Sequence, residues 1–447
     1  MKKTTTIITV LILILALVGA AYWYFIFGFG SAPVTALPGN QTTPGGFEPI
    51  DRPLPTESTL PGDMTNSSST TTTTNEPSPL ATLRHLSSVP VGGFGVFTSA
   101  SLRSGQAGST TIRWVDRGRG NTYEAYSHKP DINILSNTLV PRIYQSWWNN
   151  SLNSFFAQYS SATNDTVTTV VANIQKTVAN TPRPQNASST NISNSSTETI
   201  TETPYQLKGT LVSGNIIDIA VSPAKDRAVV VTKENNRAIG YLSKFDGTGQ
   251  TQLFSLPLTA ITVDWPETNT ISVVTKGSAS YAGYLYFINT KTGVMKQILG
   301  GIAGLSAKVS KDATRVLYSS TGRGESAIET NMLDVKTSTV TDVIFKTLAD
   351  KCTWSPKTLE QVYCAVPSTL PNGLYPDDWY LGFAAFRDNI WLLDTKTGNG
   401  KQIANLLTLG NSLIDAINLE IDNSDNYLVF MNKIDLSLWS LDLAATN

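Results

Sequence analysis

The chain has 447 residues and carries 33 Lys and Arg against 34 Asp and Glu, which gives a net charge of −1. This balance provides no overall field that would attract nucleic acid, so we expect no nucleic-acid partner. Charged residues make up only 15% of the chain. The surface is therefore expected to be rich in hydroxyl and amide groups, a composition common outside the cytoplasm.

Residues 1–30 have the features of a membrane anchor. Lys2 and Lys3 precede residues 7–29, which are 23 residues without a charge. As a helix this segment measures about 34 Å, enough to cross a bilayer. The lysines predict a cytoplasmic N-terminus, and the aromatic residues near its far end fit the opposite interface. We expect a single-pass anchor with the rest extracytoplasmic, in the periplasm or at the cell surface. The alternative is a signal peptide cleaved after Ala21 or Ala36.

Residues 31–79 are rich in Pro, Ser and Thr and poor in apolar side chains, with SSSTTTTT at 67–74. Such a segment cannot bury enough surface to offset the entropy lost on ordering, which predicts a disordered linker. A glycosylated stalk and an unmodified linker both fit this composition. Strand-like patterns begin at residue 80, so we assign residues 80–447 to one folded domain.

A short hairpin motif recurs in the second half of the chain. Each copy follows an apolar run and places Thr with Gly or Ser at a tight turn between two strands. The copies are NTKTGVMKQIL at 289–299, DVKTSTVTDVI at 334–344, DTKTGNGKQIA at 394–404 and a looser KFDGTGQTQLF at 244–254. A unit that recurs every few dozen residues predicts a repeat architecture.

A second set of similar segments gives the period of the repeat. In each, a short strand leads into a polar turn and then into an apolar, β-branched strand, as in IAVSPAKDRAVVVT at 219–232. Equivalent points are spaced by 42, 46, 45 and 67 residues, at Val221, Val263, Val309, Trp354 and Ile421. A period of about 40–45 residues with four short strands per unit is typical of a β-propeller.

The polar turns of these segments, SPAKD, SKDAT and SPKT, resemble those of WD40-like and TolB-like β-propellers, in which a turn of the form S-P-D-G joins the inner strands. The resemblance covers residues 211–447 well and residues 80–180 weakly, and the WD dipeptide is absent. It implies a scaffold used by binding platforms and by enzymes, so it names neither a ligand nor a reaction.

The repeat count predicts an all-β fold of about seven four-stranded blades, with six or eight as alternatives. The last unit, from about Leu413, has three strands, and the strand at 80–87 precedes the first full blade. We expect this N-terminal strand to complete the last blade, because pairing the two ends removes the sheet edges and closes the ring. The Ser/Thr/Asn-rich tract at 182–204 is expected to form a loop.

Cys352 and Cys364 flank the turn SPKTLE within one repeat. If that turn centres at residues 357–359, the two cysteines lie opposite each other on adjacent antiparallel strands, within reach of a disulfide. An extracytoplasmic location permits the oxidation. We predict a disulfide within one blade; the alternative is two buried free thiols.

The sequence offers few groups for catalysis. His85 and His128 are the two histidines, neither has a metal-ligand spacing, and no G-x-S-x-G motif is present. Oxygen-bearing side chains gather at 422–426, but an EF-hand would also need a Gly and a distal Glu, so an Asx-rich turn explains them better. We expect no enzymatic activity, no metal site and no cofactor.

Arg113, Arg117 and Arg119 form a small basic group in TIRWVDRGRGNTY. Beside Trp114 and Tyr123, these side chains suit an anionic glycan or a lipid head group. The alternative is a solvated hairpin turn.

An aromatic insert at 366–386 accounts for most of the long 67-residue spacing. Inserted loops on a rigid scaffold often carry binding residues. This one combines rings that could cover a sugar or a peptide with carboxylates that could accept hydroxyl or amine protons. The candidate binding residues are Tyr375, Asp377, Asp378, Trp379 and Tyr380. The alternative is a satellite core that packs the insert onto its own blade.

These features together predict a membrane-anchored, extracytoplasmic β-propeller that acts as a non-catalytic protein-binding or scaffolding module of the cell envelope. Its expected contacts are the membrane, through residues 7–29, and an envelope protein. The alternative function is a surface propeller that binds or acts on a glycan.

Overall fold

The computed structural model describes residues 80–99, 109–160, 166–176, 205–322 and 328–446. Within these ranges, no helix is long and apolar enough to cross a membrane. The predicted anchor at 7–29, the predicted linker at 31–79 and the predicted loop at 182–204 lie outside the described residues and stay predictions.

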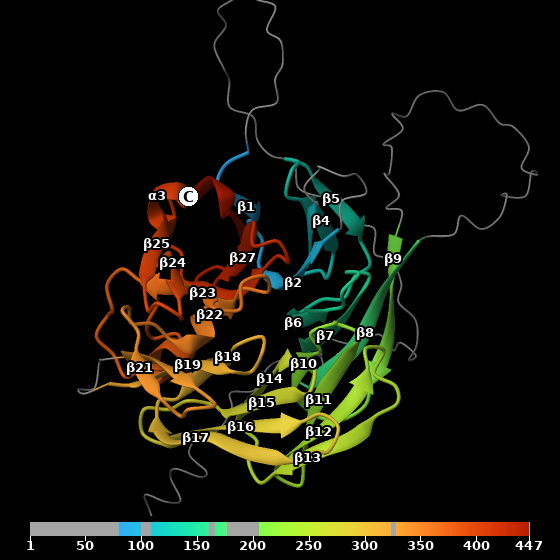
Figure 1. Ribbon diagram of the computed structural model, residues 1–447. Helices are drawn as coiled ribbons and strands as arrows, with labels where there is room; N and C mark the ends of the chain where they lie inside the picture. The colour runs from blue at the N-terminus through green and yellow to red at the C-terminus, as the bar shows by residue number, and fades with distance from the viewer. Residues whose placement is uncertain (1–79, 100–108, 161–165, 177–204, 323–327, 447) are drawn as a thin grey trace, which may run out of the picture. The chain divides into compact units, whose positions relative to one another are not determined.

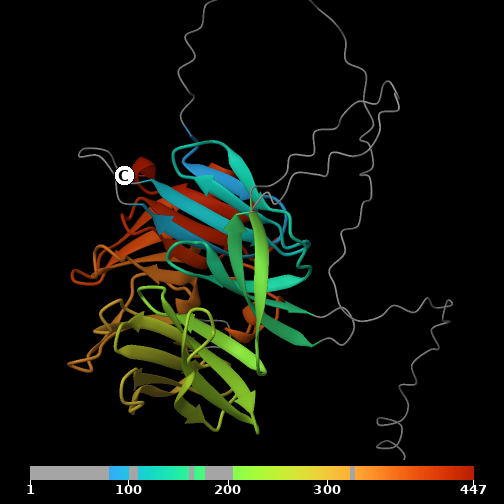
Figure 2. The same cartoon turned by 90° about the vertical axis from the view of Figure 1, so that its right-hand side faces the viewer.

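The described chain forms seven antiparallel four-stranded sheets, which are the blades of a β-propeller. The first strands of blades 1 to 6 lie nearest the middle of the ring, and successive strands lie farther out (Figure 1). Figure 2 turns the side that carries blade 2 toward the viewer. The prediction of an all-β fold with seven four-stranded blades is confirmed.

The first four blades follow one another along the chain. Blade 1 contains β2 (Val91–Thr98), β3 (Thr110–Asp116), β4 (Thr122–Tyr126) and β5 (Ile132–Ser136). Blade 2 contains β6 (Ile143–Trp148), β7 (Ser154–Ser160), β8 (Val167–Lys176) and β9 (Tyr205–Val212). Blade 3 contains β10 (Ile216–Val221), β11 (Arg227–Glu234), β12 (Arg237–Lys244) and β13 (Thr251–Leu256). Blade 4 contains β14 (Ile261–Glu267), β15 (Thr270–Thr275), β16 (Ala282–Asn289) and β17 (Met295–Ala303).

The remaining blades carry the short helices. Blade 5 contains β18 (Ser306–Val309), β19 (Arg315–Thr321), β20 (Ile328–Asp334) and β21 (Val340–Asp342). Blade 6 contains β22 (Cys352–Trp354), β23 (Gln361–Pro367), β24 (Asp388–Asp394) and β25 (Gly400–Asn405). Blade 7 contains β26 (Ala416–Ile421), β27 (Tyr427–Asn432), β28 (Leu438–Asp442) and β1 (Leu83–Ser87). The helices within the described ranges are η1 (Ala349–Lys351), α2 (Asp377–Tyr380), α3 (Leu406–Gly410) and η2 (Ala444–Thr446).

Strand β11 shows why the blade interiors are apolar at successive positions. Val229 and Val231 pack into a cluster that includes Trp265 of blade 4. Ala228 and Val230, on the opposite face, pack into a cluster with Phe156 of blade 2. Because side chains alternate between the faces of a strand, a blade covered on both sides needs apolar residues at every position.

Strand β1 closes the ring, as the repeat count predicted. It pairs antiparallel with β28, and Leu83 lies opposite Leu441. Blade 7 therefore takes its outermost strand from residues before blade 1 and its other three strands from the end of the described chain. This arrangement covers a sheet edge that would otherwise be open for pairing with another chain.

In the recurrent polar turns, a side chain just after the first strand accepts hydrogen bonds from backbone N–H groups where the second strand begins. In blade 7, Asp422 Oδ1 accepts from the backbone N–H groups of Asn426 and Tyr427 at 2.7 and 2.9 Å. In blade 3, Ser222 Oγ accepts from those of Asp226 and Arg227. The Asp422 carboxylate therefore closes the turn at 422–426 by accepting from backbone N–H groups, and the described residues contain no cluster of His, Cys, Asp and Glu suited to a metal ion.

Candidate binding face of the propeller

The aromatic insert connects β23 to β24 of blade 6 and is fixed to two other blades. Asp377 Oδ2 accepts from the backbone N–H of Ala279 at 2.7 Å, in the loop between β15 and β16 of blade 4. The carbonyl oxygen of Tyr375 accepts from Thr321 Oγ1 of blade 5 at 2.8 Å. The insert therefore extends past blade 5 as far as blade 4 and is held there by specific hydrogen bonds.

One side of the insert forms a small core of its own. Tyr375 and Trp379 are only 1% and 5% exposed, and they pack with Phe386, Leu348 and Ile328. The faces of these two rings are covered by protein, as the satellite-core alternative describes. Asp378 is engaged locally, because its Oδ2 accepts from the backbone N–H of Leu374 at 2.7 Å.

The other side of the insert exposes apolar side chains. Phe383 is 80% exposed and Leu381 is 68% exposed, although both lie shortly after the buried Trp379 in the chain. Tyr281 of blade 4, two residues beyond Ala279, is 76% exposed. Together with the half-exposed Tyr380, these residues make up what we call the insert face. The sequence pointed to Phe383 as one of the aromatic residues of the insert but did not assign Phe383, Tyr281 or Leu381 to the binding site, since nothing in the pattern separates buried from exposed apolar residues in a loop.

Tyr380 connects the insert face to a set of charged side chains near the first strands. Its hydroxyl donates to the carboxylate of Asp350 in η1. Partial desolvation by the surrounding protein atoms raises the pKa of the Asp350 carboxyl, and partial desolvation together with the Asp350 charge raises the pKa of the Tyr380 hydroxyl. The phenol therefore stays a hydrogen-bond donor at neutral pH.

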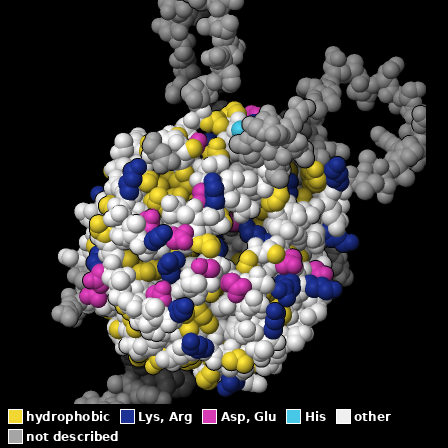
Figure 3. All heavy atoms as spheres, viewed as in Figure 1, with side chains coloured by type: hydrophobic (Ala, Val, Ile, Leu, Met, Phe, Trp, Pro, Cys, Tyr) yellow, Lys and Arg dark blue, Asp and Glu magenta, His cyan; other side chains and the backbone are white. Residues whose placement is uncertain are grey.

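Lys308 of β18 and Asp264 of β14 form an ion pair at 2.8 Å between blades 5 and 4. The Asp264 charge raises the pKa of the Lys308 ammonium, against the effect of burial. Burial favours the neutral form of Asp264, yet Lys308 and Lys311 hold the pKa of its carboxyl below the usual value. Both groups are thus charged at neutral pH. Figure 3 shows acidic and basic side chains close together around a hollow near the middle of the face in view.

A second ion pair joins blades that are not neighbours. Lys225, in the turn between β10 and β11 of blade 3, pairs with Glu420 of β26 in blade 7. The same Nζ lies 3.5 Å from the carbonyl oxygen of Val96 in blade 1. Because blades 3 and 7 are separated by others around the ring, this side chain reaches across the middle of the propeller.

The three predicted arginines do not act as one group. Arg113 lies in a cavity of about 490 Å³ at one end of blade 1, and Glu124, Tyr126 and His128 also line it. Its guanidinium pairs with Glu124 at 2.6 Å and donates to the carbonyl oxygen of Leu152 at 2.7 Å. Residues 117 and 119 lie in the turn at the other end of β3 and do not line the cavity.

The same cavity contains one of the two histidines. His128 Nδ1 and Ser109 Oγ are hydrogen-bonded at 2.9 Å. Tyr126 donates to Glu124 Oε1 at 2.6 Å, and this hydrogen bond raises the pKa of the Tyr126 hydroxyl to about 12. Among the described residues, no carboxylate hydrogen-bonds the other ring nitrogen of His128, the position that the orienting acid takes in a catalytic triad.

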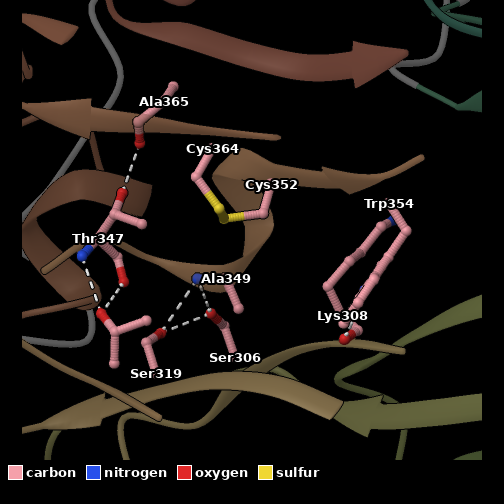
Figure 4. The surroundings of a disulfide bond; sticks show 10 residues. Ser306, Lys308, Ser319, Thr347, Ala349, Cys352, Trp354, Cys364 and Ala365 are labelled. Carbon is pink, nitrogen blue, oxygen red and sulfur yellow. Dashed lines mark hydrogen bonds between the residues drawn. A yellow bond between two sulfur atoms is a disulfide. The ribbon is translucent and has the colours of Figure 1, made fainter. Parts of the chain in front are cut away.

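The predicted disulfide is present in blade 6. Cys352 of β22 lies directly opposite Cys364 of β23, and their sulfur atoms are 2.07 Å apart. Figure 4 shows the bond beside a hydrogen-bond network in which Thr347 donates to the carbonyl oxygen of Ala365 at 2.6 Å. The disulfide and this network hold the connection from blade 5 to blade 6.

Beside the disulfide, three ionisable side chains are fully buried. Lys351 of η1 pairs with Asp388 at the start of β24, with 2.8 Å between Nζ and Oδ2. It also pairs with Asp415, which immediately precedes β26. All three side chains are 0% exposed. The cluster lies against the small core of the insert, since the Trp379 and Phe386 rings lie within 5.0 and 5.2 Å of Nζ.

No family model and no curated protein matches the chain. Among solved structures, it is similar to the tricorn protease, with 8% identity, a TM-score of 0.48, and coverage of 83% of this chain and 35% of that one. The β-propeller domain of the Trilobed protease from Pyrococcus furiosus matches with 11% identity, a TM-score of 0.44, and 78% and 95% coverage. TolB from Acinetobacter baumannii matches with 8% identity, a TM-score of 0.37, and 69% and 78% coverage.

At such low identity, the similarity concerns the fold alone. The architecture rests on the strand pairing itself, which gives seven blades closed by β1 and β28. The described chain is therefore a seven-bladed β-propeller, and propellers of the TolB class are among the solved structures that it resembles.

Proposed function

We propose that this protein is a membrane-anchored, extracytoplasmic propeller that binds a protein of the cell envelope through the insert face and catalyses no reaction. The observation that carries the proposal is the exposure of Phe383, Leu381 and Tyr281 on loops that hydrogen bonds hold in place. Exposed apolar side chains gathered on a fixed scaffold are typical of protein interaction sites. Aromatic residues are also enriched among those that dominate binding energy.

The proposed location draws on two features. The uncharged segment 7–29 has the length of a membrane span. The Cys352–Cys364 disulfide fits an oxidising compartment, because such bonds rarely persist in the cytosol. A glycan-binding function has less support, since Tyr375 and Trp379, two of the rings assigned to it, are buried.

Site-specific photo-crosslinking of the full chain in cells tests the binding face. A photoreactive residue at position 383 is expected to capture a discrete partner. The same residue at Val294, which is 66% exposed in the β16–β17 turn, serves as the matched control. Adding Leu381→Ser should abolish the product at position 383. Equal amounts of crosslinked product at positions 383 and 294 would refute the proposed face. A product at position 383 that persists after Leu381→Ser, or no product there at all, would also refute it.

The topology is tested separately on intact cells. A protease that cleaves the propeller without opening the cells would place it at the cell surface, and cleavage only after the outer layer is opened would place it in the periplasm. Protection until the cytoplasmic membrane is broken would refute the proposed location. Sequencing the mature N-terminus then distinguishes the retained anchor from cleavage after Ala21 or Ala36.

A further inference from the structure

The buried cluster of Lys351, Asp388 and Asp415 lies where blade 6, the insert and blade 7 meet. One ammonium faces two carboxylates in a space without solvent access. Lys351 Nζ also donates to the carbonyl oxygen of Ala416 at 2.9 Å. Burying charges is costly even when they are paired, and here the acidic groups outnumber the basic one.

The two oxygens of Asp415 have different surroundings. Oδ1 accepts a hydrogen bond from Lys351 Nζ. Oδ2 accepts from Trp379 Nε1 and from the backbone N–H of Phe386, each at 2.9 Å. Two fixed N–H donors on one carboxyl oxygen are the arrangement that stabilises the oxyanion of a tetrahedral intermediate in acyl transfer. An amine thus touches one oxygen of Asp415 while an oxyanion site holds the other.

Asp388 is placed to carry protons. Its Oδ2 lies 2.8 Å from Lys351 Nζ and also accepts from the backbone N–H of Ala416 at 2.7 Å. Its Oδ1 is buried and has no hydrogen-bond partner among the described residues. Burial raises the pKa of this carboxyl to about 6, although Lys351 opposes the shift. A carboxyl with a pKa near ambient pH can both accept and return a proton.

We propose that Lys351 and Asp415 condense into an intramolecular isopeptide bond that the protein forms without another enzyme. A proton passes from the Nζ ammonium to Asp415 Oδ1, which leaves an amine and a neutral carboxylic acid. The nitrogen lone pair attacks Cγ while Trp379 Nε1–H and the Phe386 N–H stabilise the charge on Oδ2. Asp388 takes a second proton from nitrogen and delivers it to Oδ1.

The Cγ–Oδ1 bond then breaks, and Oδ1 leaves with its electron pair and both protons as water. The third proton remains on the amide nitrogen, and Asp388 ends in the state in which it began. The reaction needs no oxidant and no co-reactant. It also replaces a buried ammonium and a buried carboxylate by a neutral amide, whose oxygen keeps both N–H donors.

The bond would join the start of blade 6 covalently to the start of blade 7, the blade completed by β1. Lys351 directly precedes Cys352, so an amide and a disulfide would act on adjacent residues. This inference does not depend on the proposed function, since it concerns only groups inside the propeller.

Mass spectrometry of the full chain, unfolded and with its disulfide reduced, tests the proposal. The reference is Lys351→Arg protein made in the same way, so that processing of the N-terminus cancels. After correction for the mass difference between Lys and Arg, we expect the wild-type protein to be lighter than the reference by the mass of one water molecule. Tryptic digestion should give one branched peptide that joins Lys351 to Asp415. A wild-type mass without this loss would refute the bond, whether or not the variants fold.

Three variants test the assigned roles. Asp415→Asn should give a product of wild-type mass, because the same amide then forms with loss of ammonia. Asp388→Asn should leave most of the chain unlinked. Lys433→Arg should leave the bond intact, although the Lys433 Nζ lies 5.1 Å from the Trp379 ring. A branched peptide through Asp388 or Lys433 would overturn the assignment.

Discussion

His85 of β1 stacks on Trp439 of β28, with ring centroids 4.2 Å apart and planes inclined by 10°. The two residues lie directly opposite each other in the ladder that closes the ring. The indole is buried, and its Nε1 donates to Ser437 Oγ at 2.8 Å. The contact between the first and last described strands therefore includes side-chain stacking as well as backbone pairing.

We predict that Trp439→Ala destabilises the propeller by about 3–5 kcal/mol, the usual cost of deleting a buried tryptophan side chain. His85→Ala should cost at most about 0.5–1.5 kcal/mol, because His85 is exposed and loses mainly the ring stacking. Urea unfolding of the two single variants and the double variant measures both values and their coupling. Equal, small effects would show that the closing strand adds little to stability.

Ring closure could be predicted from the sequence because the prediction requires only a count of the strands in each unit. A last unit with three strands and an extra strand near residue 80 leave one consistent pairing. The disulfide was predictable for a similar reason, since a local turn fixes which residues of a hairpin face each other. Both features depend on strand order and register, which repeats and turn residues encode directly.

The clusters of buried and exposed side chains could not be predicted from the repeats and turn residues. Lys351, Asp388 and Asp415 come together because the connection before blade 6, the end of the insert and the connection before blade 7 converge. Repeats carry no information about how such connections fold. The insert shows the same limit: Trp379, in α2, is buried and Phe383, just beyond α2, is exposed, although both are aromatic residues of one short segment.

Removal of the disulfide by Cys352→Ser with Cys364→Ser should lower stability by about 2–3 kcal/mol, the value expected for a short closed loop. The cysteines are 12 residues apart in sequence. Thermal unfolding of wild-type protein with and without reductant should show the same loss. The double variant should show no response to reductant, and a response there would mean that the reductant acts elsewhere.

Asp218 of β10 should make stability depend on pH. Burial raises the pKa of its carboxyl to about 6, although backbone N–H groups of Val263 and Ile219 and the charge of Lys276 oppose the shift, while Asp264 adds to it. The folded state therefore binds this proton at a higher pH than the unfolded chain does. Linkage then requires that the contribution of Asp218 to stability rises as pH falls from about 7 to about 4.

The test compares wild type with Asp218→Asn by urea unfolding at several pH values. The unfolding free energy of wild type, measured relative to that of Asp218→Asn, should increase as pH falls through 6. Asp131→Asn, at an exposed carboxylate before β5, is the control. A wild-type minus Asp218→Asn difference that stays constant between pH 4 and 7 would contradict the prediction.

The ion pair between Lys225 and Glu420 should stabilise the ring modestly. Its side chains are 29% and 31% exposed, so the coupling free energy is expected to be about 0.2–1 kcal/mol. A double-mutant cycle with Lys225→Met and Glu420→Gln measures it, and added salt should reduce it. No coupling at low salt would show that the pair adds nothing to holding blade 3 against blade 7.

Substitutions of Trp379 and Phe383, two aromatic residues of the insert, should have different effects: the first should lower stability and the second should weaken partner binding. Trp379→Ala removes a buried ring and its hydrogen bond to Asp415, so we expect a loss of about 3–5 kcal/mol. Phe383→Ala changes a side chain that is 80% exposed, so its effect on stability should stay within about 0.5 kcal/mol. Urea unfolding measures both effects, and crosslinking from a photoreactive residue at Tyr281 measures partner capture. Phe383→Ala should reduce that capture while leaving the fold unchanged; a stability loss like that of Trp379→Ala would instead place Phe383 in the core of the insert.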